Sequence, residues 1–179
     1  MPSTSRVLDE RAMSRALQRM ASEVVERCQG TDGLVLVGIQ RRGVELAERL
    51  GEMIHRAEGR AIPQGKLDIT LYRDDLQSIG PRPVVGETRL PRDVNGLTIV
   101  IVDDVLYTGR TIRAALDELA DFGRPRRILL CVLVDRGGRE LPIHPDIVGL
   151  TITTSPNDRV DVRVRELDGD DGVDLVRAA

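Results

Sequence analysis

The chain has 179 residues, 41% of them hydrophobic, and a net charge of −3 at pH 7, which favours one full domain and excludes a protein that coats nucleic acid by bulk attraction. No stretch approaches the roughly 20 apolar residues of a membrane span, and the N-terminus lacks a signal-peptide apolar run, so we expect a cytoplasmic protein without membrane contact. Cys28 and Cys131 lie outside any CxxC or Cys/His cluster, which favours buried free thiols over disulfide or zinc chemistry.

The first elements in chain order are a helix, a strand and a second helix. Residues 9–28 carry apolar side chains at helical spacing, with Asp9 as the expected N-cap and Gly30 as the stop. The run LVLVGI (34–39) predicts a strand that is buried on both faces. A helix is expected from about Gly43 to His55.

Further along, residues 67–76 (LDITLYRDDL) predict a strand with a charged end. Residues 76–97 hold three prolines and three glycines, which favours a long loop, either a lid or a disordered excursion, with room for a short hairpin. Strands at 98–104 and 127–135 flank a helix expected from Arg110 to Phe122. This alternation predicts an α/β domain with a largely parallel sheet, and the acidic tail is expected to be a solvated terminal strand with a frayed end.

In such sheets ligands bind beyond the carboxyl ends of the strands, which directs attention to residues 38–43, 103–111 and 135–140. Asp103 and Asp104 end one strand, and residues 108–111 open the next helix, where backbone N–H groups and two threonine hydroxyls suit a phosphate. The carboxylates suit sugar hydroxyls or a Mg²⁺ ion. An Asp-rich helix cap is the plainer alternative. No GxGxxG or Walker lysine motif supports a nicotinamide or P-loop site.

The segment VIVDDVLYTGRT (100–111) resembles the phosphoribosyl-pyrophosphate motif of type I phosphoribosyltransferases. The resemblance implies that family's fold, a twisted, largely parallel sheet flanked by helices with a small hood. It implies catalytic roles for Asp103 and Asp104 at the ribose, with Mg²⁺ carried by the substrate. The 5-phosphate would lie in the loop formed by Val105, Leu106, Tyr107, Thr108, Gly109, Arg110 and Thr111. The turn GIQRRG would hold pyrophosphate through Arg41 and Arg42, and Arg42 is preferred because close relatives usually have threonine at position 41.

The same resemblance places three further groups of residues in the site. Tyr72 and catalytic Arg73 would begin a flexible loop, about 73–97, that closes over pyrophosphate. Asp135 would approach the Mg²⁺ side, whereas Arg136 would pair with Asp135 or face the base. A hood built mainly from the N-terminal edge and residues 141–165 would recognise uracil through backbone near Val160.

Together with GRPRR and VLVDRGGRELPI, these segments resemble one branch of the family, the bifunctional pyrimidine operon attenuation regulators and uracil phosphoribosyltransferases. This implies synthesis of UMP and pyrophosphate from uracil and 5-phosphoribosyl-1-pyrophosphate, sensing of UMP or UTP, and a homodimer or larger homo-oligomer. Arg19 and Arg139 match positions that bind leader RNA, whereas Gly138, His144 and Leu150 replace basic or histidine residues of relatives. An RNA-binding sensor with little catalysis and an enzyme without RNA binding both remain open.

Overall fold

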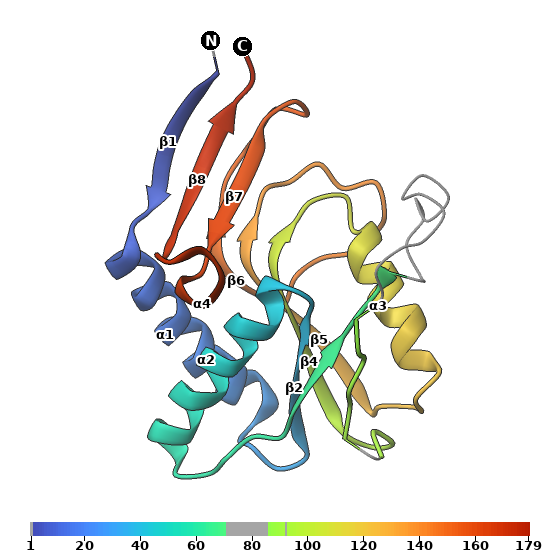
Figure 1. Cartoon of the computed structure of the whole chain (residues 1–179). Helices are drawn as coiled ribbons and strands as arrows, with labels where there is room; N and C mark the ends of the chain where they lie inside the picture. Colours follow the sequence, from blue (N-terminus) through green and yellow to red (C-terminus); the bar gives the residue numbers. More distant parts are fainter. Residues whose placement is uncertain (1, 71–85, 92) are drawn as a thin grey trace.

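A computed structural model describes residues 2–70, 86–91 and 93–179, and its strands form two sheets (Figure 1). The larger sheet has five parallel strands in the order β3-β2-β4-β5-β6, as expected for the α/β fold. Its strands are β2 (Leu34–Ile39), β3 (Gln64–Leu67), β4 (Thr98–Leu106), β5 (Arg127–Asp135) and β6 (Ile147–Thr151).

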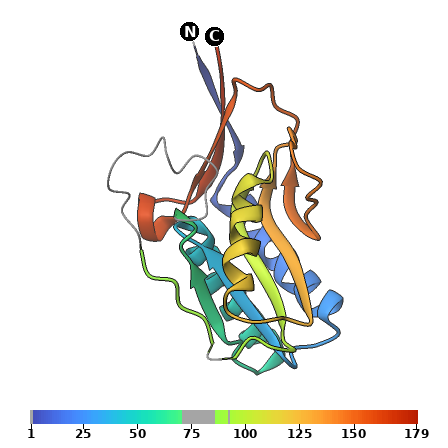
Figure 2. The same cartoon turned by 90° about the vertical axis from the view of Figure 1, so that its right-hand side faces the viewer.

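Helices cover both faces of the larger sheet. α1 (Glu10–Cys28) and α2 (Arg42–Glu58) lie on one face and α3 (Arg110–Ala120) on the other (Figures 1 and 2). Alternate residues of the central strands point into the two resulting cores, so that Leu36 packs with α1 and α2 whereas Val37 packs with α3. Among the described residues, no helix combines the length and the apolar character that crossing a membrane requires.

A second, antiparallel sheet of three strands stands above the carboxyl ends of the larger one, and both chain termini lie at its far tip (Figure 1). Its order is β1-β8-β7, and the short helix α4 lies between its last two strands in sequence. The bounds are β1 (Ser3–Leu8), β7 (Arg159–Arg163), α4 (Arg165–Asp168) and β8 (Gly172–Arg177).

The expectation of a solvated C-terminal strand is wrong. β8 is the central strand of the small sheet, paired with β1 and β7, and its Val173 and Leu175 are buried, Val173 in the core that also contains α1. The small sheet therefore depends on the tail. Within residues 141–165, β7 belongs to the small sheet, whereas β6 pairs with β5 in the larger one.

The other helices and strands that the sequence predicted are found close to the expected positions, with one displaced strand. Asp9 caps α1 through a 2.8 Å bond that its carboxylate accepts from the N–H of Ala12. The strand predicted to begin at residue 67 instead spans Gln64–Leu67, where it pairs with β2, and residues 71–76 of that prediction lie outside the described residues. Cys131 is buried, as expected, and burial raises its pKa, whereas Cys28 is only half-buried.

Candidate active site

A cleft of about 390 Å³ opens at the carboxyl ends of β2, β3 and β4, within the size range of small-ligand pockets. Parallel strands bring segments that are distant in sequence to one edge, which is why the cleft forms there. The lining residues come from the β2–α2 turn, the segment after β3, and the end of β4 with the start of α3. They are Ile39, Gln40, Arg41, Arg42, Asp68, Ile69, Thr70, Asp103, Asp104, Val105 and Thr111.

Asp103 and Asp104 form an acidic pair at the end of β4. The Asp103 carboxylate accepts a 2.9 Å bond from the N–H of Asp104, and the Asp104 carboxylate accepts a 2.8 Å bond from the N–H of Val105. Burial, followed by the negative charge of Asp104, raises the pKa of Asp103 well above its usual range. A bound cation or sugar hydroxyls would relieve this repulsion, so the pair fits the polyhydroxylated, Mg²⁺-bearing ligand that the sequence predicts.

Two glycines allow α2 to begin directly against the end of β4. A Cβ atom on Gly43 would lie 2.4 Å from the carbonyl oxygen of Val102, and one on Gly38 would lie 2.4 Å from the Cα of Val44. Real side chains do not tolerate such contacts with backbone. The absence of these two Cβ atoms therefore sets how closely the arginine turn, Arg41 and Arg42 between β2 and α2, approaches the acidic pair.

The turn that precedes α3 is held by the segment after β5. The carbonyl of Thr108 accepts bonds from the N–H groups of Glu140 (2.9 Å) and Leu141 (3.1 Å), and Arg110 pairs with the Glu140 carboxylate at 2.7 Å. Gly109 has a φ of 92°, which favours glycine. Behind this turn the first N–H groups of α3 lack intrahelical partners, as at every helix N-terminus, and are suited to bind an anion.

Tyr107 and Arg136 form a stacked pair. The guanidinium lies 3.8 Å from the centre of the tyrosine ring, and it donates bonds to the hydroxyl of Thr154 (3.0 Å) and the carbonyl of Ser155 (3.1 Å). Of the two roles expected for Arg136, pairing with Asp135 is therefore not found. Arg136 instead joins the motif to the segment that follows β6.

Asp135 pairs with Arg139 at 2.7 Å and accepts a 3.0 Å bond from the N–H of Gly137. Leu106 is a core residue, and Val160 pairs with Leu175 within the small sheet. Neither side chain lines the cleft. The sequence motif is thus divided between residues that face the ligand cleft and residues that shape it.

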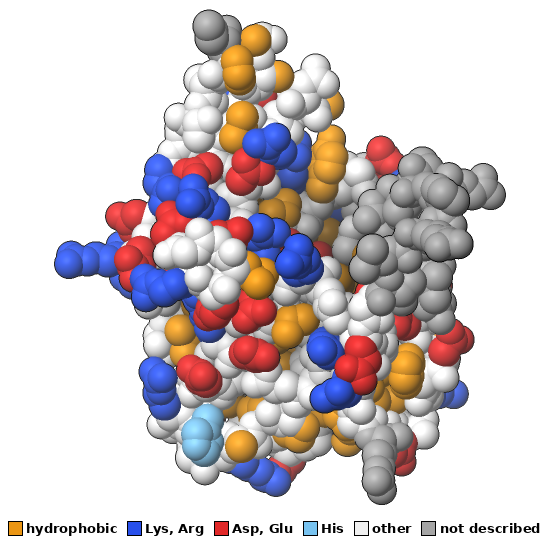
Figure 3. All heavy atoms as spheres, in the orientation of Figure 1, with side chains coloured by type: hydrophobic (Ala, Val, Ile, Leu, Met, Phe, Trp, Pro, Cys, Tyr) orange, Lys and Arg blue, Asp and Glu red, His pale blue; other side chains and the backbone are white. Residues whose placement is uncertain are grey.

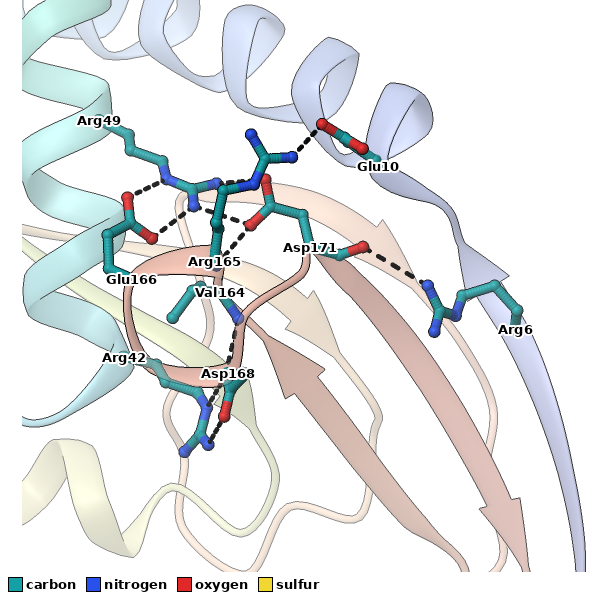
Figure 4. A network of polar contacts seen from close by, with 9 residues as sticks. All are labelled: Arg6, Glu10, Arg42, Arg49, Val164, Arg165, Glu166, Asp168 and Asp171. Carbon is teal, nitrogen blue, oxygen red and sulfur yellow. Dashed lines mark hydrogen bonds and ion pairs between the residues drawn. The ribbon is translucent and has the colours of Figure 1, made fainter.

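The two arginines of the β2–α2 turn differ in their surroundings. Arg41 is exposed at the cleft, whereas Arg42 forms a two-point pair with Asp168 of α4, with distances of 2.8 and 3.2 Å (Figure 4). The bond to Asp168, together with its negative charge, raises the pKa of Arg42. Arg42 therefore remains charged beside the cleft.

Sequence reasoning missed Gln40, Asp68 and Thr70, which line the same cleft. Burial acts to raise the pKa of Asp68, but bonds from the hydroxyl and N–H of Thr70 and from the N–H of Gly86 outweigh it and lower the pKa. A signal for Asp68 was available, because the first polar residue after a strand of a parallel sheet occupies the same edge as Asp103. Placing the strand three residues too late concealed it.

Two further groups of residues were expected to contact ligands. Tyr72 and Arg73 fall outside the described residues, as does most of the predicted loop. Arg19 donates bonds of 3.0 and 2.6 Å to the carbonyls of Val148 and Gly149, and so fastens α1 to β6. Arg139 donates to the carbonyls of Tyr107 and Ile143 as well as to Asp135. Both arginines that were expected at RNA are thus engaged within the chain.

Comparison with known proteins agrees with this geometry. Residues 3–167 match the model of the phosphoribosyl transferase domain. The chain belongs to the phosphoribosyltransferase family. It is 61% identical to the bifunctional protein PyrR of Thermus aquaticus over 163 residues, which cover 91% of this chain and 90% of the relative. It is 55% identical to the bifunctional protein PyrR of Chloroflexus aurantiacus over 179 residues, which cover 100% of this chain and 98% of the relative.

The fold of this chain is also similar to those of solved phosphoribosyltransferase structures. A hypoxanthine phosphoribosyltransferase from Trypanosoma cruzi superimposes with a TM-score of 0.74 at 18% identity, over 96% of this chain and 94% of the other. At this identity the likeness concerns the fold alone. The expected fold class is therefore confirmed.

Proposed function

We propose that this phosphoribosyltransferase transfers the phosphoribosyl group of 5-phosphoribosyl-1-pyrophosphate to uracil, forming UMP and pyrophosphate. The observation that carries the proposal is the convergence of Asp103 and Asp104, the arginine turn and the start of α3 on one cleft. The strong similarity to bifunctional PyrR proteins over nearly the whole chain supports the choice of uracil.

In the reaction N1 of uracil forms a bond with C1 of the ribose, the bond from C1 to the pyrophosphate oxygen breaks with its electron pair, and the N1 proton passes to solvent. Asp103 and Asp104 accept hydrogen bonds from the ribose hydroxyls and favour the positive charge that develops on the ring. Thr111 and the first turn of α3 hold the 5-phosphate, while Arg41 and Arg42 bind the departing pyrophosphate.

The donor set fits Mg²⁺ brought by the substrate. Among the described residues no group of three or more His, Cys, Asp or Glu side chains is arranged to hold a metal alone, whereas the repulsion between Asp103 and Asp104 favours a cation. Mg²⁺ commonly binds through one or two carboxylates plus phosphate oxygens. When bound, Mg²⁺ would supply charge neutralisation for the leaving group, with Asp103 and Asp104 as its protein partners.

The parts of the site beyond the described cleft complete the proposal. Tyr72 and Arg73 cover the pyrophosphate, and closure of the segment from about residue 73 to 97 excludes water from the sugar cation. The small sheet acts as a hood, and the backbone near Val160 recognises the base. Asp135, which is tied to Arg139, shapes the adjoining loop.

The test is UMP formation from labelled uracil, phosphoribosyl pyrophosphate and Mg²⁺. We expect Asp104→Asn to lower kcat at least about a hundredfold, because charge stabilisation in the transition state is lost. Asp117→Asn is the matched control, since that carboxylate lies on α3 outside the cleft and pairs with Arg113. Failure of the unsubstituted chain to form more UMP than a protein carrying both Asp103→Ala and Asp104→Ala would overturn the assignment.

The word bifunctional in the names of the relatives favours a second function, control of pyrimidine genes through leader RNA with UMP or UTP as the signal. Because Arg19 and Arg139 are engaged within the chain, binding would use other exposed arginines, presented by a homodimer or larger assembly. A pyrimidine-leader transcript should bind more tightly than a scrambled RNA when UMP is present. Equal affinities at physiological salt would refute this function and leave the enzyme alone.

A further inference from the structure

Arg42 is hydrogen-bonded to a residue of the helix α4, outside the cleft. Its Nε and Nη2 atoms donate to the two carboxylate oxygens of Asp168 at 3.2 and 2.8 Å (Figure 4). The two residues are 126 positions apart, one at the start of α2 and the other at the end of α4. A two-point pair of this kind fixes both the position and the plane of a guanidinium.

Asp168 is itself held in place. One of its oxygens also accepts a 2.8 Å bond from the N–H of Val164, so the carboxylate is fixed by backbone before it meets the arginine. The bonds from Arg42 and from Val164 lower the pKa of Asp168 and keep it ionised at neutral pH. The support for Arg42 is therefore rigid as well as charged.

The third nitrogen of the guanidinium, Nη1, is not used in the pair with Asp168. Nε and Nη2 of Arg42 bond to Asp168, and no hydrogen bond from Nη1 to another described residue is found. Arg42 also lines the cleft, together with Asp104. The side chain is 35% exposed, so a ligand can reach it. One edge of the group is committed to α4, and Nη1 is available to a phosphate oxygen.

We propose that Asp168 is a positioning residue for the transfer reaction, which holds Arg42 so that its free corner meets the pyrophosphate group. The proposal rests on the proposed function, because it takes Arg42 as a pyrophosphate ligand. It also gives α4 a role that fold stability alone does not require.

Two further ion pairs on the same face of α2 stabilise the fold. Arg49, two turns after Arg42 on α2, binds Glu166 at 2.5 Å and Asp171 at 2.8 Å, and so ties α2 to the α4 region away from the cleft (Figure 4). Figure 3 shows basic and acidic side chains intermingled on this face of the molecule. Glu166 thus offers a matched control, since its loss weakens the same junction without touching Arg42.

The experiment measures binding of phosphoribosyl pyrophosphate with Mg²⁺ to the full chain by calorimetry, alongside KM values for both substrates. Asp168→Ala should weaken phosphoribosyl pyrophosphate binding about tenfold, on the scale of coupling within a shared hydrogen-bond network, and leave the KM for uracil unchanged. The affinity of Asp168→Asn for phosphoribosyl pyrophosphate should lie between those of the unsubstituted chain and Asp168→Ala, because asparagine keeps an acceptor but loses the charge. Glu166→Ala should bind as the unsubstituted chain does.

A double-mutant cycle completes the test. In the background of Arg42→Ala, the further change Asp168→Ala should have no effect on binding, because the group that Asp168 holds is gone. An equal loss in that background, or an equal loss in Glu166→Ala, would show a general structural effect and overturn the proposal. Unchanged binding by Asp168→Ala overturns this proposal alone, whereas no binding by the unsubstituted chain overturns the proposed function with it.

Discussion

Replacing Gly43 by alanine should separate the arginine turn from the acidic pair. The new Cβ would lie 2.4 Å from the carbonyl oxygen of Val102, and real Cβ atoms essentially never approach a heavy atom closer than 3.0 Å. The difference, 3.0 minus 2.4, requires a displacement of at least about 0.6 Å. Backbone lies on both sides of the contact, so no flexible side chain can absorb this shift.

Overpacking of this kind costs about 1–3 kcal/mol of unfolding free energy, and a displacement approaching 1 Å near reacting groups lowers kcat/KM by up to about a hundredfold. Both effects are measurable by urea unfolding and by UMP formation with purified Gly43→Ala. The reasoning requires the two losses together, because one movement produces them.

Gly51→Ala on the same helix is the matched control. Its Cβ would approach the terminal amide of Gln64, which is exposed and can move, whereas alanine favours the helix by up to about 1 kcal/mol. We expect near-normal kcat/KM and unfolding free energy. A Gly43→Ala protein that matches Gly51→Ala in both measurements would refute the steric account of this junction.

Three further predictions concern the elements around the cleft. Bonds from Arg49 and Arg42 lower the pKa values of Glu166 and Asp168 below their unfolded values, so the stability that these carboxylates contribute is present above about pH 4 and lost as the pH falls. Because Arg49→Gln removes the partner of Glu166, its unfolding free energy in urea should decline less steeply with falling pH than that of the unsubstituted chain. Identical profiles of unfolding free energy against pH would contradict this. Arg136→Lys should lower the unfolding free energy by about 1–2 kcal/mol because an ammonium cannot reproduce the stacked, two-bond geometry, and an unchanged melting temperature would argue against it. Val173→Ala should cost about 1–3 kcal/mol in urea unfolding, whereas a change below about 0.5 kcal/mol would mean that the tail is not part of the core.

The sequence predicted the parallel sheet and its binding edge well, because buried parallel strands are nearly continuous apolar runs. LVLVGI and RILLCVLVD leave little alternative, and the two acids after β4 identify the ligand side of the sheet. The small sheet was harder to predict. β8 alternates with Asp174 between Val173 and Leu175, which is equally typical of a solvated strand, and Val173 is buried only through packing into the core that contains α1.

Side-chain partners across the fold were not predictable from local patterns. Arg136 was expected to pair with Asp135 or face the base; it stacks on Tyr107 rather than pairing with Asp135. The contact between Arg42 and Asp168 joins segments whose proximity is created by the docking of α4 on α2. A motif identifies the type of ligand group, whereas the orientation of that group depends on long-range packing.

The pairing of β1 with β8 has a consequence for how the protein is made. Arg6 and Asp174, which bond across these strands, are 168 residues apart, so β1 leaves the ribosome long before β8 and cannot pair with it until β8 has been synthesised. Meanwhile the larger sheet can assemble from neighbouring segments. The small sheet should therefore close last, and ribosome-bound chains that stop before β8 should display β1 to proteases and chaperones as an accessible extended segment.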